Sequence, residues 1–193
     1  MRQSSAEIDH AILDVAAGIF ATYGFQHASV QQIADAVGYS KPGLLHRFGS
    51  KEALHSAVLR EVSETVQEIV GQALALHEQP DQMSQVLELM TRKALARPGM
   101  IQMMLQAFDP ASEEPGVETA QAAGYRLVDA LDQPLSSPMH RLRIVLALKL
   151  IVTAAMTQHS PVDADLHVDE EELVPVLVAL AQQVMGQPLP AAR

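Results

Sequence analysis

Residues 29–54 read SVQQIADAVGYSKPGLLHRFGSKEAL and contain two short helical patterns separated by a glycine. The first pattern begins after Ser29, a candidate N-cap, and ends at Gly38, which tolerates left-handed backbone geometry. The second begins after Ser40, another candidate cap, and has Pro42 in its first turn, where a missing N–H does little harm. Two short helices joined by a tight turn predict a helix-turn-helix, whose second helix enters the major groove of DNA.

Four groups of residues in and around this stretch match one known pattern in register. They are Phe20 with Tyr23-Gly24-Phe25, Val30-x-x-Ile33-Ala34, Gly38-x-Ser40-Lys41, and Phe48-x-Ser50-Lys51-Glu52-Ala53-Leu54. Together they make residues 11–59 resemble the N-terminal DNA-binding domain of the TetR family of bacterial transcriptional regulators. The resemblance covers about a quarter of the 193 residues and implies a DNA-binding regulator of transcription.

Composition is consistent with a folded protein of the cytoplasm. Hydrophobic residues make up 48% of the chain but aromatic residues only 4%, so a core must rest on Leu, Val, Ala and nine Met. The absence of Cys excludes disulfides, thiolate metal sites and cysteine nucleophiles. Residues 1–10 contain no secretory signal, and Lys149 interrupts the apolar run 144–156, so we expect no membrane association.

The formal net charge of −10 is unevenly distributed. Residues 1–60 carry five Lys/Arg and five Asp/Glu, whereas residues 61–193 carry eight and eighteen. Three of the five N-terminal cations lie within residues 41–51. Because this basic cluster is small, we expect DNA binding to need two copies of the chain.

Apolar periodicity predicts an all-α protein of about nine helices and no strand. Outside the helix-turn-helix, the expected helices cover residues 6–23, 51–77, 80–95, 100–108, 117–131, 138–159 and 169–186. Residues 1–52 would form the three-helix DNA-binding domain. A helix on the order of 40 Å long would join it to a ligand-binding and dimerisation domain at residues 53–193.

The expected helix over residues 138–159 is apolar on two sides. One stripe consists of Leu142, Val145, Leu146 and Val152, and the other of Ile144, Leu148, Ile151 and Ala155. One stripe can pack on the core while the other needs a partner, and we expect Leu148 to face outward. The TetR resemblance implies a homodimer through the last two long helices, which suits a palindromic operator. The alternative is two buried helices in a monomer.

Candidate DNA-binding residues follow first from chemistry: Lys41, His46, Arg47 and Lys51 can donate to phosphates and base edges. The resemblance places Lys41, Pro42 and Gly43 against bases, and His46, Arg47 and Lys51 against phosphates. It places Ser29 and the first N–H groups of its helix on the DNA backbone, which agrees with the anion affinity of a helix N-terminus. Gln31, Gln32 and Tyr39 complete the candidate set, together with Leu45.

The recognition helix departs from the family pattern at two positions. Leu45 stands where the family commonly has Tyr, and Gly43 where it often has Thr or Asn. Leu45 can contact a thymine methyl, but few side chains remain for hydrogen bonds to bases. The alternative interpretation of these polar residues is the solvated face of a short helix.

Methionines are the main candidates for an effector pocket, because methionine lines adaptable sites as readily as it fills core gaps. The candidate residues are Met90, Met100, Met103, Met104, Phe108, Lys149 and Met156. Lys149 stands alone among apolar residues and we expect it to face inward, where it must reach solvent, pair with a carboxylate or contact an acidic effector. The hypothesis is a mostly apolar small molecule, with one acidic group as an option; ordinary core packing is the alternative.

Enzyme and metal motifs are weak. Glu7…His10 and Glu52…His55 have metal-ligand spacing, but they flank the DNA-binding unit. The acidic stretch 163–174 lacks the glycine and the final glutamate of a calcium loop. We therefore expect no catalysis, metal or cofactor, and interpret the chain as an effector-released repressor acting on double-stranded operator DNA. The alternatives are a ligand-independent regulator or activator, a dimeric helical interaction module, and an enzyme on a helical bundle.

Overall fold

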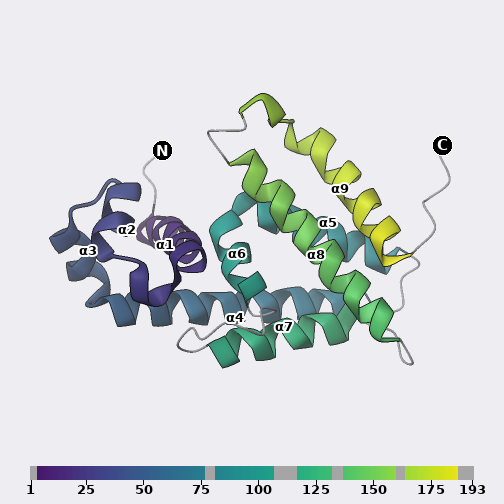
Figure 1. Ribbon diagram of the computed structural model, residues 1–193, viewed down its shortest axis with the longest axis horizontal. Helices are drawn as coiled ribbons and strands as arrows, with labels where there is room; N and C mark the ends of the chain where they lie inside the picture. The colour runs from purple at the N-terminus through teal and green to yellow at the C-terminus, as the bar shows by residue number, and fades with distance from the viewer. Residues whose placement is uncertain (1–3, 77–80, 107–116, 132–136, 160–163, 187–193) are drawn as a thin grey trace. The chain divides into compact units, whose positions relative to one another are not determined.

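The computed structural model describes residues 4–76, 81–106, 117–131, 137–159 and 164–186. Within these residues the chain forms nine α-helices and one short 3₁₀ helix, with no strand, which confirms the predicted all-α class (Figure 1). The elements are α1 Ser5–His27, α2 Val30–Ala36, α3 Lys41–Phe48, α4 Lys51–Ala75, α5 Gln82–Ala96, α6 Pro98–Gln106, α7 Val117–Leu131, α8 Pro138–Gln158, η1 Ala164–Leu166 and α9 Glu170–Met185.

The bounds differ from the expected ones at several helix ends. Helix α6 begins at Pro98, two residues before the expected start at Met100, because proline is well suited to a first helical position. The 3₁₀ turn η1 was not predicted. The expected ends of the fourth and sixth helices, residues 77 and 107–108, lie outside the described residues.

The chain divides into two compact units, Met1–Glu64 with Gly99–Ala122, and Thr65–Pro98 with Ala123–Arg193. Helices α4, α6 and α7 contribute residues to both units, α6 only its first residue to the second. The predicted boundary after residue 52 was drawn between a DNA-binding part and a ligand-binding part, not between compact units. It stays a prediction.

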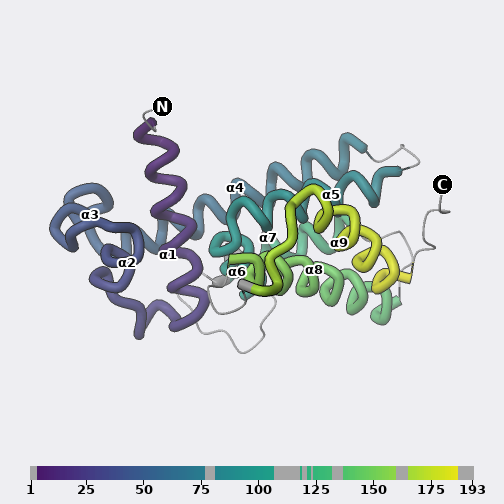
Figure 2. The backbone as a smooth tube through the Cα atoms, turned by 90° about the horizontal axis from the view of Figure 1, so that it is seen from above, coloured from purple at the N-terminus to yellow at the C-terminus, as the bar shows by residue number. Residues whose placement is uncertain are grey.

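In the first unit, α1, α2, α3 and the start of α4 lie close together (Figure 2) and bury apolar side chains. Its largest fully buried side chains include Phe20, Ile12, Ile33, Leu44 and Leu54. Gly24 interrupts α1 with φ 76°, and only Phe25–His27 continue the helix beyond it. The predicted end of regular helix at this glycine is therefore confirmed.

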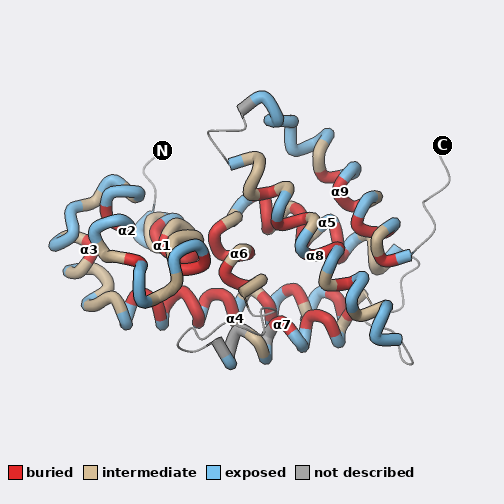
Figure 3. The backbone as a smooth tube through the Cα atoms, viewed as in Figure 1, coloured by how far each residue is buried: buried red, intermediate tan, exposed pale blue. Residues whose placement is uncertain are grey.

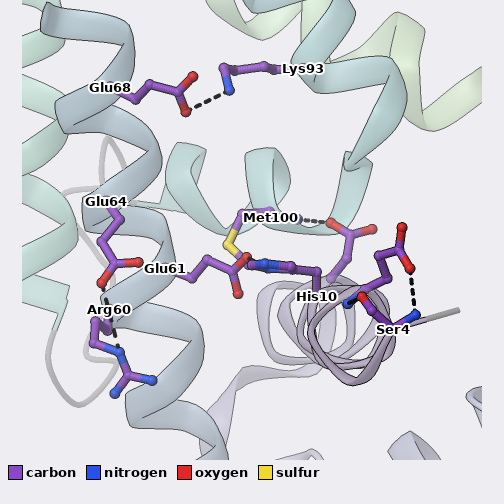
Figure 4. A network of polar contacts seen from close by, with 10 residues as sticks. Ser4, His10, Arg60, Glu61, Glu64, Glu68, Lys93 and Met100 are labelled. Carbon is purple, nitrogen blue, oxygen red and sulfur yellow. Dashed lines mark hydrogen bonds and ion pairs between the residues drawn. The ribbon is translucent and has the colours of Figure 1, made fainter.

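Helix α6 also belongs to the first unit and crosses α1 at very short range. The Cα of Gly99 lies 3.4 Å from where a Cβ on Gly18 would stand. A Cβ on Gly99 would overlap the carbonyl oxygen of Asp14 and lie 2.9 Å from the amide nitrogen of Gly18. The Asp14 carboxylate accepts a 2.8 Å hydrogen bond from the N–H of Met100 (Figure 4), so α1 supplies the cap of α6.

In the second unit, α5, α8 and α9 pack against one another. Along α8, Ile144, Leu148 and Ile151 are buried, whereas Leu142 and Leu146 are 49% and 47% exposed. The expectation that Leu148 faces outward is therefore wrong, and Leu142 and Leu146 lie on the outward stripe. Both stripes are equally apolar in sequence, so periodicity alone could not decide which one meets the core.

Buried residues follow one side of each long helix and most of α6 (Figure 3). None of the helices in the described part of the chain is long and apolar enough to cross a membrane.

Candidate nucleic-acid interface

The first helix of the helix-turn-helix is capped at Ser29, as predicted. The Ser29 hydroxyl accepts a 3.1 Å hydrogen bond from the N–H of Gln32, and the Gln32 side chain accepts one of 2.9 Å from the N–H of Ser29. This reciprocal capping box gives Gln32 a structural role that was not predicted, although Ser-x-x-Gln is the sequence signal for it. Gln31 donates to Asp35 at 2.7 Å, so both glutamines already have partners within α2 and its cap.

The turn that joins α2 to α3 has the expected geometry. Gly38 has φ 70°, and the N–H of Tyr39 donates to the carbonyl of Ala34 at 2.8 Å. Ser40 then caps α3 by accepting a 3.1 Å hydrogen bond from the N–H of Gly43. These contacts fix the direction of α3 relative to α2, which positions a recognition helix.

Helix α3 buries one face and exposes the other. Leu44 is 1% exposed and holds the helix to the core, while Lys41, Pro42 and His46 are exposed and Leu45 is partly exposed. The Lys41 side chain makes no hydrogen bond or ion pair with any described residue. Lys41 and Pro42 therefore form an accessible surface at the N-terminus of α3.

The absence of a side chain at Gly43 has a local explanation. A Cβ at this position would lie 3.1 Å from the Ser40 hydroxyl oxygen and 3.8 Å from the ring of Tyr39. The first of these distances is tight for a carbon beside the capping oxygen. Gly43 thus suits the cap of α3, and a larger residue there must displace Ser40 slightly.

Arg47 turns back toward α1. Its Nε forms an ion pair with the carboxylate of Asp9, and its Nη2 donates to the Ser5 carbonyl and hydroxyl oxygens, each at 2.8 Å. The hydrogen bond to Asp9 raises the pKa of Arg47. Arg47 was predicted to face phosphate, but in the free protein its guanidinium is engaged by α1.

Lys51 also has partners inside the protein. Its Nζ lies 4.5 Å from the centroid of the Phe25 ring and 3.4 Å from the carbonyl oxygen of Gln26. Lys51 and Arg47 thus differ from Lys41, which has no such contact with the described residues.

A cleft of about 650 Å³ separates α3 from α1 and α4. Its lining includes Asp9 and Leu13 from α1, Tyr39 and Arg47 from the helix-turn-helix, and Arg60 from α4. The predicted DNA-binding residue Tyr39 therefore lines this cleft. Beside it, Arg60 and Glu64 form an exposed ion pair on α4 (Figure 4).

The candidate effector residues are spread over both units. Met100, Met103 and Met104 are buried in α6 of the first unit, and Met90 is buried in α5 of the second. Met156 is partly exposed, and Phe108 lies outside the described residues. These residues line neither the cleft beside α3 nor the cavity between α5 and α9.

The orientation of Lys149 differs from the predicted one. It was predicted to face the interior, but it is exposed on α8, on the same side as Leu142 and Leu146. Its apolar neighbours in sequence belong to two different faces of the helix. Because Lys149 is exposed, there is no longer a reason to expect an acidic group on the effector.

The two Glu-x-x-His pairs have other partners. The Glu7 carboxylate accepts a 2.6 Å hydrogen bond from the N–H of Ser4, and His10 pairs with Glu61 (Figure 4). His55 is 4% exposed, and its ring lies edge-on to Phe20 at 4.9 Å between centroids. Among the described residues no group of three His, Asp or Glu side chains is arranged to hold a metal ion.

The capped helices α2 and α3, joined by a tight turn and with one face of α3 exposed, form a helix-turn-helix. Residues 12–58 match a family described as "Bacterial regulatory proteins, tetR family". Residues 12–58 are therefore a TetR-family DNA-binding domain, as the sequence motifs predict.

Curated proteins similar to part of this chain are named as transcriptional regulators. The chain is 48% identical over 52 residues to the HTH-type transcriptional regulator RutR of Escherichia coli (strain K12), which covers 27% of this chain and 24% of RutR. It is 36% identical over 61 residues to the HTH-type transcriptional repressor AcnR of Corynebacterium glutamicum, which covers 32% of each. The chain thus matches only about a quarter to a third of the length of these curated relatives.

A solved structure extends the likeness of fold to the remainder of the chain. A TetR-family transcriptional regulator from Bordetella parapertussis superposes with a TM-score of 0.54 at 23% identity, covering 92% of each chain. At this identity the likeness concerns the fold alone.

Proposed function

We propose that this protein is a transcriptional repressor that binds a palindromic DNA operator as a homodimer and is released by a small, mostly apolar effector. The observation that carries the DNA-binding part is the N-terminal half of α3. There Lys41 and Pro42 are exposed while Leu44 is buried against the core. An exposed, capped helix of this kind can enter a major groove without rearrangement.

The proposed contacts divide into two groups. Lys41, Pro42 and Gly43 would meet base edges, and Leu45 would meet a thymine methyl. His46 and the N-terminus of α2 at Ser29 would meet phosphates. The other candidates would contact DNA either by giving up a contact that they make within the protein or from the edge of this surface. They are Gln31, Gln32, Tyr39, Arg47 and Lys51.

The proposed dimer uses one face of the second unit. Met139, Leu142 and Leu146 are exposed on α8, and Val176 and Leu180 are exposed on α9, which packs beside it. Soluble monomers rarely leave such a set of large apolar side chains unpaired. A second copy would bury them in an isologous contact and present two recognition helices to a palindromic site.

The proposed effector acts through α6. Methionines 100, 103 and 104 give this helix a flexible apolar side, and Asp14 of α1 caps its N-terminus. A molecule that displaces α6 would therefore change contacts made by α1. Repression is favoured by AcnR, which is named a transcriptional repressor.

The test is fluorescence anisotropy with duplexes that tile the DNA upstream of the protein's own gene, with a scrambled duplex of equal composition as the control. We expect tight, cooperative binding of two chains to one duplex and none of comparable strength to the scrambled DNA. Equal affinity for both would contradict a sequence-specific regulator and favour the dimeric interaction module. In a promoter-reporter assay, a rise in transcription on adding the protein would favour the activator instead.

A further inference from the structure

The accessible surface of the recognition helix combines one cation with apolar side chains. Lys41 and Pro42 are exposed, and Leu45 is partly exposed. Leu45 lies four positions after Lys41 and three after Pro42, so the three side chains are neighbours on the surface of α3. We call these three residues the base-contact patch. Their side chains offer an ammonium donor and apolar contact, but no hydrogen-bond acceptor.

Amide and carboxylate acceptors are absent from α3 and already bonded in α2. The sequence of α3, KPGLLHRF, contains no Asn, Gln, Asp or Glu. In α2, Gln31 donates to the Asp35 carboxylate at 2.7 Å, and the side-chain oxygen of Gln32 accepts the N–H of Ser29. The exposed His46 is among the proposed phosphate contacts. Adenine N6 and cytosine N4 are donors in the major groove, so the base-contact patch has no partner for either of them.

Guanine and thymine present the groups that this patch can contact. Guanine has two major-groove acceptors, N7 and O6, which suit an ammonium donor, and thymine carries a methyl group. Lys41 makes no hydrogen bond or ion pair with any described residue, so its binding to a base would break no internal contact. Four residues of helix rise about 6 Å, close to two base-pair steps of about 3.4 Å. The patch therefore spans a guanine and the thymines next to it.

Gly43 allows the short ring of Pro42 to reach a base. Contact with a methyl group requires carbon atoms to approach within about 4 Å. Because Gly43 has no side chain, the backbone next to Pro42 can come close to the floor of the groove. A Cβ at Gly43 would lie 3.1 Å from the Ser40 hydroxyl oxygen, so a side chain there would crowd the cap as well as hold α3 away from the bases. Gly43 thus favours recognition by close apolar contact.

From these observations we infer that the protein selects its operator through the 5-methyl groups of thymine, contacted by Pro42 and Leu45, and through a guanine bound by Lys41. Side chains of α3 do not read adenine or cytosine. This inference rests on the proposed function and deepens it, because it names the base groups that the same surface selects. Each half-site then holds its guanine within about two base-pair steps of the contacted thymines.

The experiment starts from the duplex that binds most tightly among those tiled upstream of the protein's own gene. This duplex is copied enzymatically with one base replaced throughout. Uracil in place of thymine removes the methyl group and keeps the base pair, and 7-deazaguanine removes N7 of guanine. 7-Deazaadenine makes the same change in a base that the protein does not read, so it is the matched control. Fluorescence anisotropy with the full chain gives the affinity for each duplex.

Uracil DNA should bind the wild-type protein at least about tenfold more weakly, because one methyl contact in each of two half-sites contributes about fourfold apiece. 7-Deazaguanine should also weaken binding about tenfold, and 7-deazaadenine less than about twofold. Leu45→Ala should show a smaller uracil effect than the wild type, and Lys41→Ala should lose the 7-deazaguanine effect. Leu74→Ala, the same change at an exposed leucine on α4, should keep both effects.

Three results would overturn the inference. They are equal affinity for thymine and uracil duplexes, equal weakening by the two deazapurines, and a uracil effect as large in Leu45→Ala as in the wild type. The last would mean that the methyl groups act through the shape of the DNA. If the natural duplex is still preferred over the scrambled one, the proposed function survives any of these results, whereas the absence of any preferred duplex overturns both. The base analogues test the wild-type protein, so they decide the question even if Leu45→Ala fails to fold.

Discussion

Asp9 on α1 and Arg47 on the recognition helix α3 form an ion pair, and Ser5 adds two hydrogen bonds to the same guanidinium. The pair joins residues 38 positions apart and is partly exposed, with 26% of the Arg47 side chain and 39% of the Asp9 side chain accessible. Asp9 therefore competes with any DNA phosphate for the most firmly engaged cation of the recognition helix.

Asp9→Asn should release Arg47 toward the DNA backbone. We expect tighter binding to all duplexes and a salt dependence steeper by about one phosphate contact in a plot of log affinity against log salt. In an Arg47→Ala background the same change should have no such effect. Anisotropy at several salt concentrations measures both. An unchanged slope in Asp9→Asn, with a lower melting temperature, would assign the pair to stability alone.

Lys41→Ala should reduce sequence discrimination. Its side chain is exposed at the start of α3, where a base contact is worth about 1–3 kcal/mol at the cognate site. Arg126→Ala removes one positive charge from an exposed position on α7 and serves as the control. Competition between operator and scrambled duplexes gives the specificity ratio. If Lys41→Ala lowers both affinities equally, the lysine contacts phosphate and not bases.

Local signals account for the part of the site that the sequence predicts correctly. Gly38, Ser40 and Pro42 each specify backbone geometry through their own chemistry, and the turn and cap follow from three neighbouring residues. The partner of Arg47 could not be predicted in this way, because nothing near Arg47 in sequence indicates Asp9. The same holds for Asp14, which caps a helix 86 residues away.

Side-chain orientation on the last long helices was also beyond reach of the sequence. Leu146 and Leu148 have the same chemistry and lie two positions apart, yet only Leu148 is buried. Lys149 follows Leu148 directly and is exposed. A helix that is apolar on two sides is expected to pack against two partners. The sequence does not show which side packs on the core and which side packs on the other partner.

The N-terminus of α1 should depend on pH. The hydrogen bond from the N–H of Ser4 lowers the pKa of Glu7, so the charged carboxylate is favoured in the folded protein. Its contribution is present above the ordinary glutamate pKa and is lost as the pH falls through the lowered one. Amide exchange at Ser4, corrected for intrinsic rates, should accelerate there. Glu7→Gln keeps the capping geometry and should abolish this dependence; if it does not, another group titrates.

Gly99→Ala and Gly71→Ala should have opposite effects on stability. A Cβ at Gly99 overlaps the Asp14 carbonyl, whereas a Cβ at Gly71 meets nothing within 4 Å. Gly99→Ala should lower the free energy of unfolding by about 1–3 kcal/mol, and Gly71→Ala should raise it by about 0.5–1 kcal/mol through helix propensity. Urea denaturation measures both. Equal stability of Gly99→Ala and wild type would mean that the α1–α6 crossing is looser than described.

Leu146→Glu should convert the protein to a monomer while preserving its fold. Leu146 is 47% exposed on the outward stripe of α8, where a second copy would bury it and a charge there would be left without a partner. Leu74→Glu makes the same change at a leucine that is 60% exposed on α4 and should leave assembly unchanged. Leu148→Glu, at a position only 2% exposed, should instead unfold the second unit, which far-ultraviolet circular dichroism detects.

Sedimentation velocity at micromolar concentration separates dimer from monomer. A wild-type protein that sediments as a monomer would contradict the proposed dimer, and a dimeric Leu146→Glu would place the interface on another face.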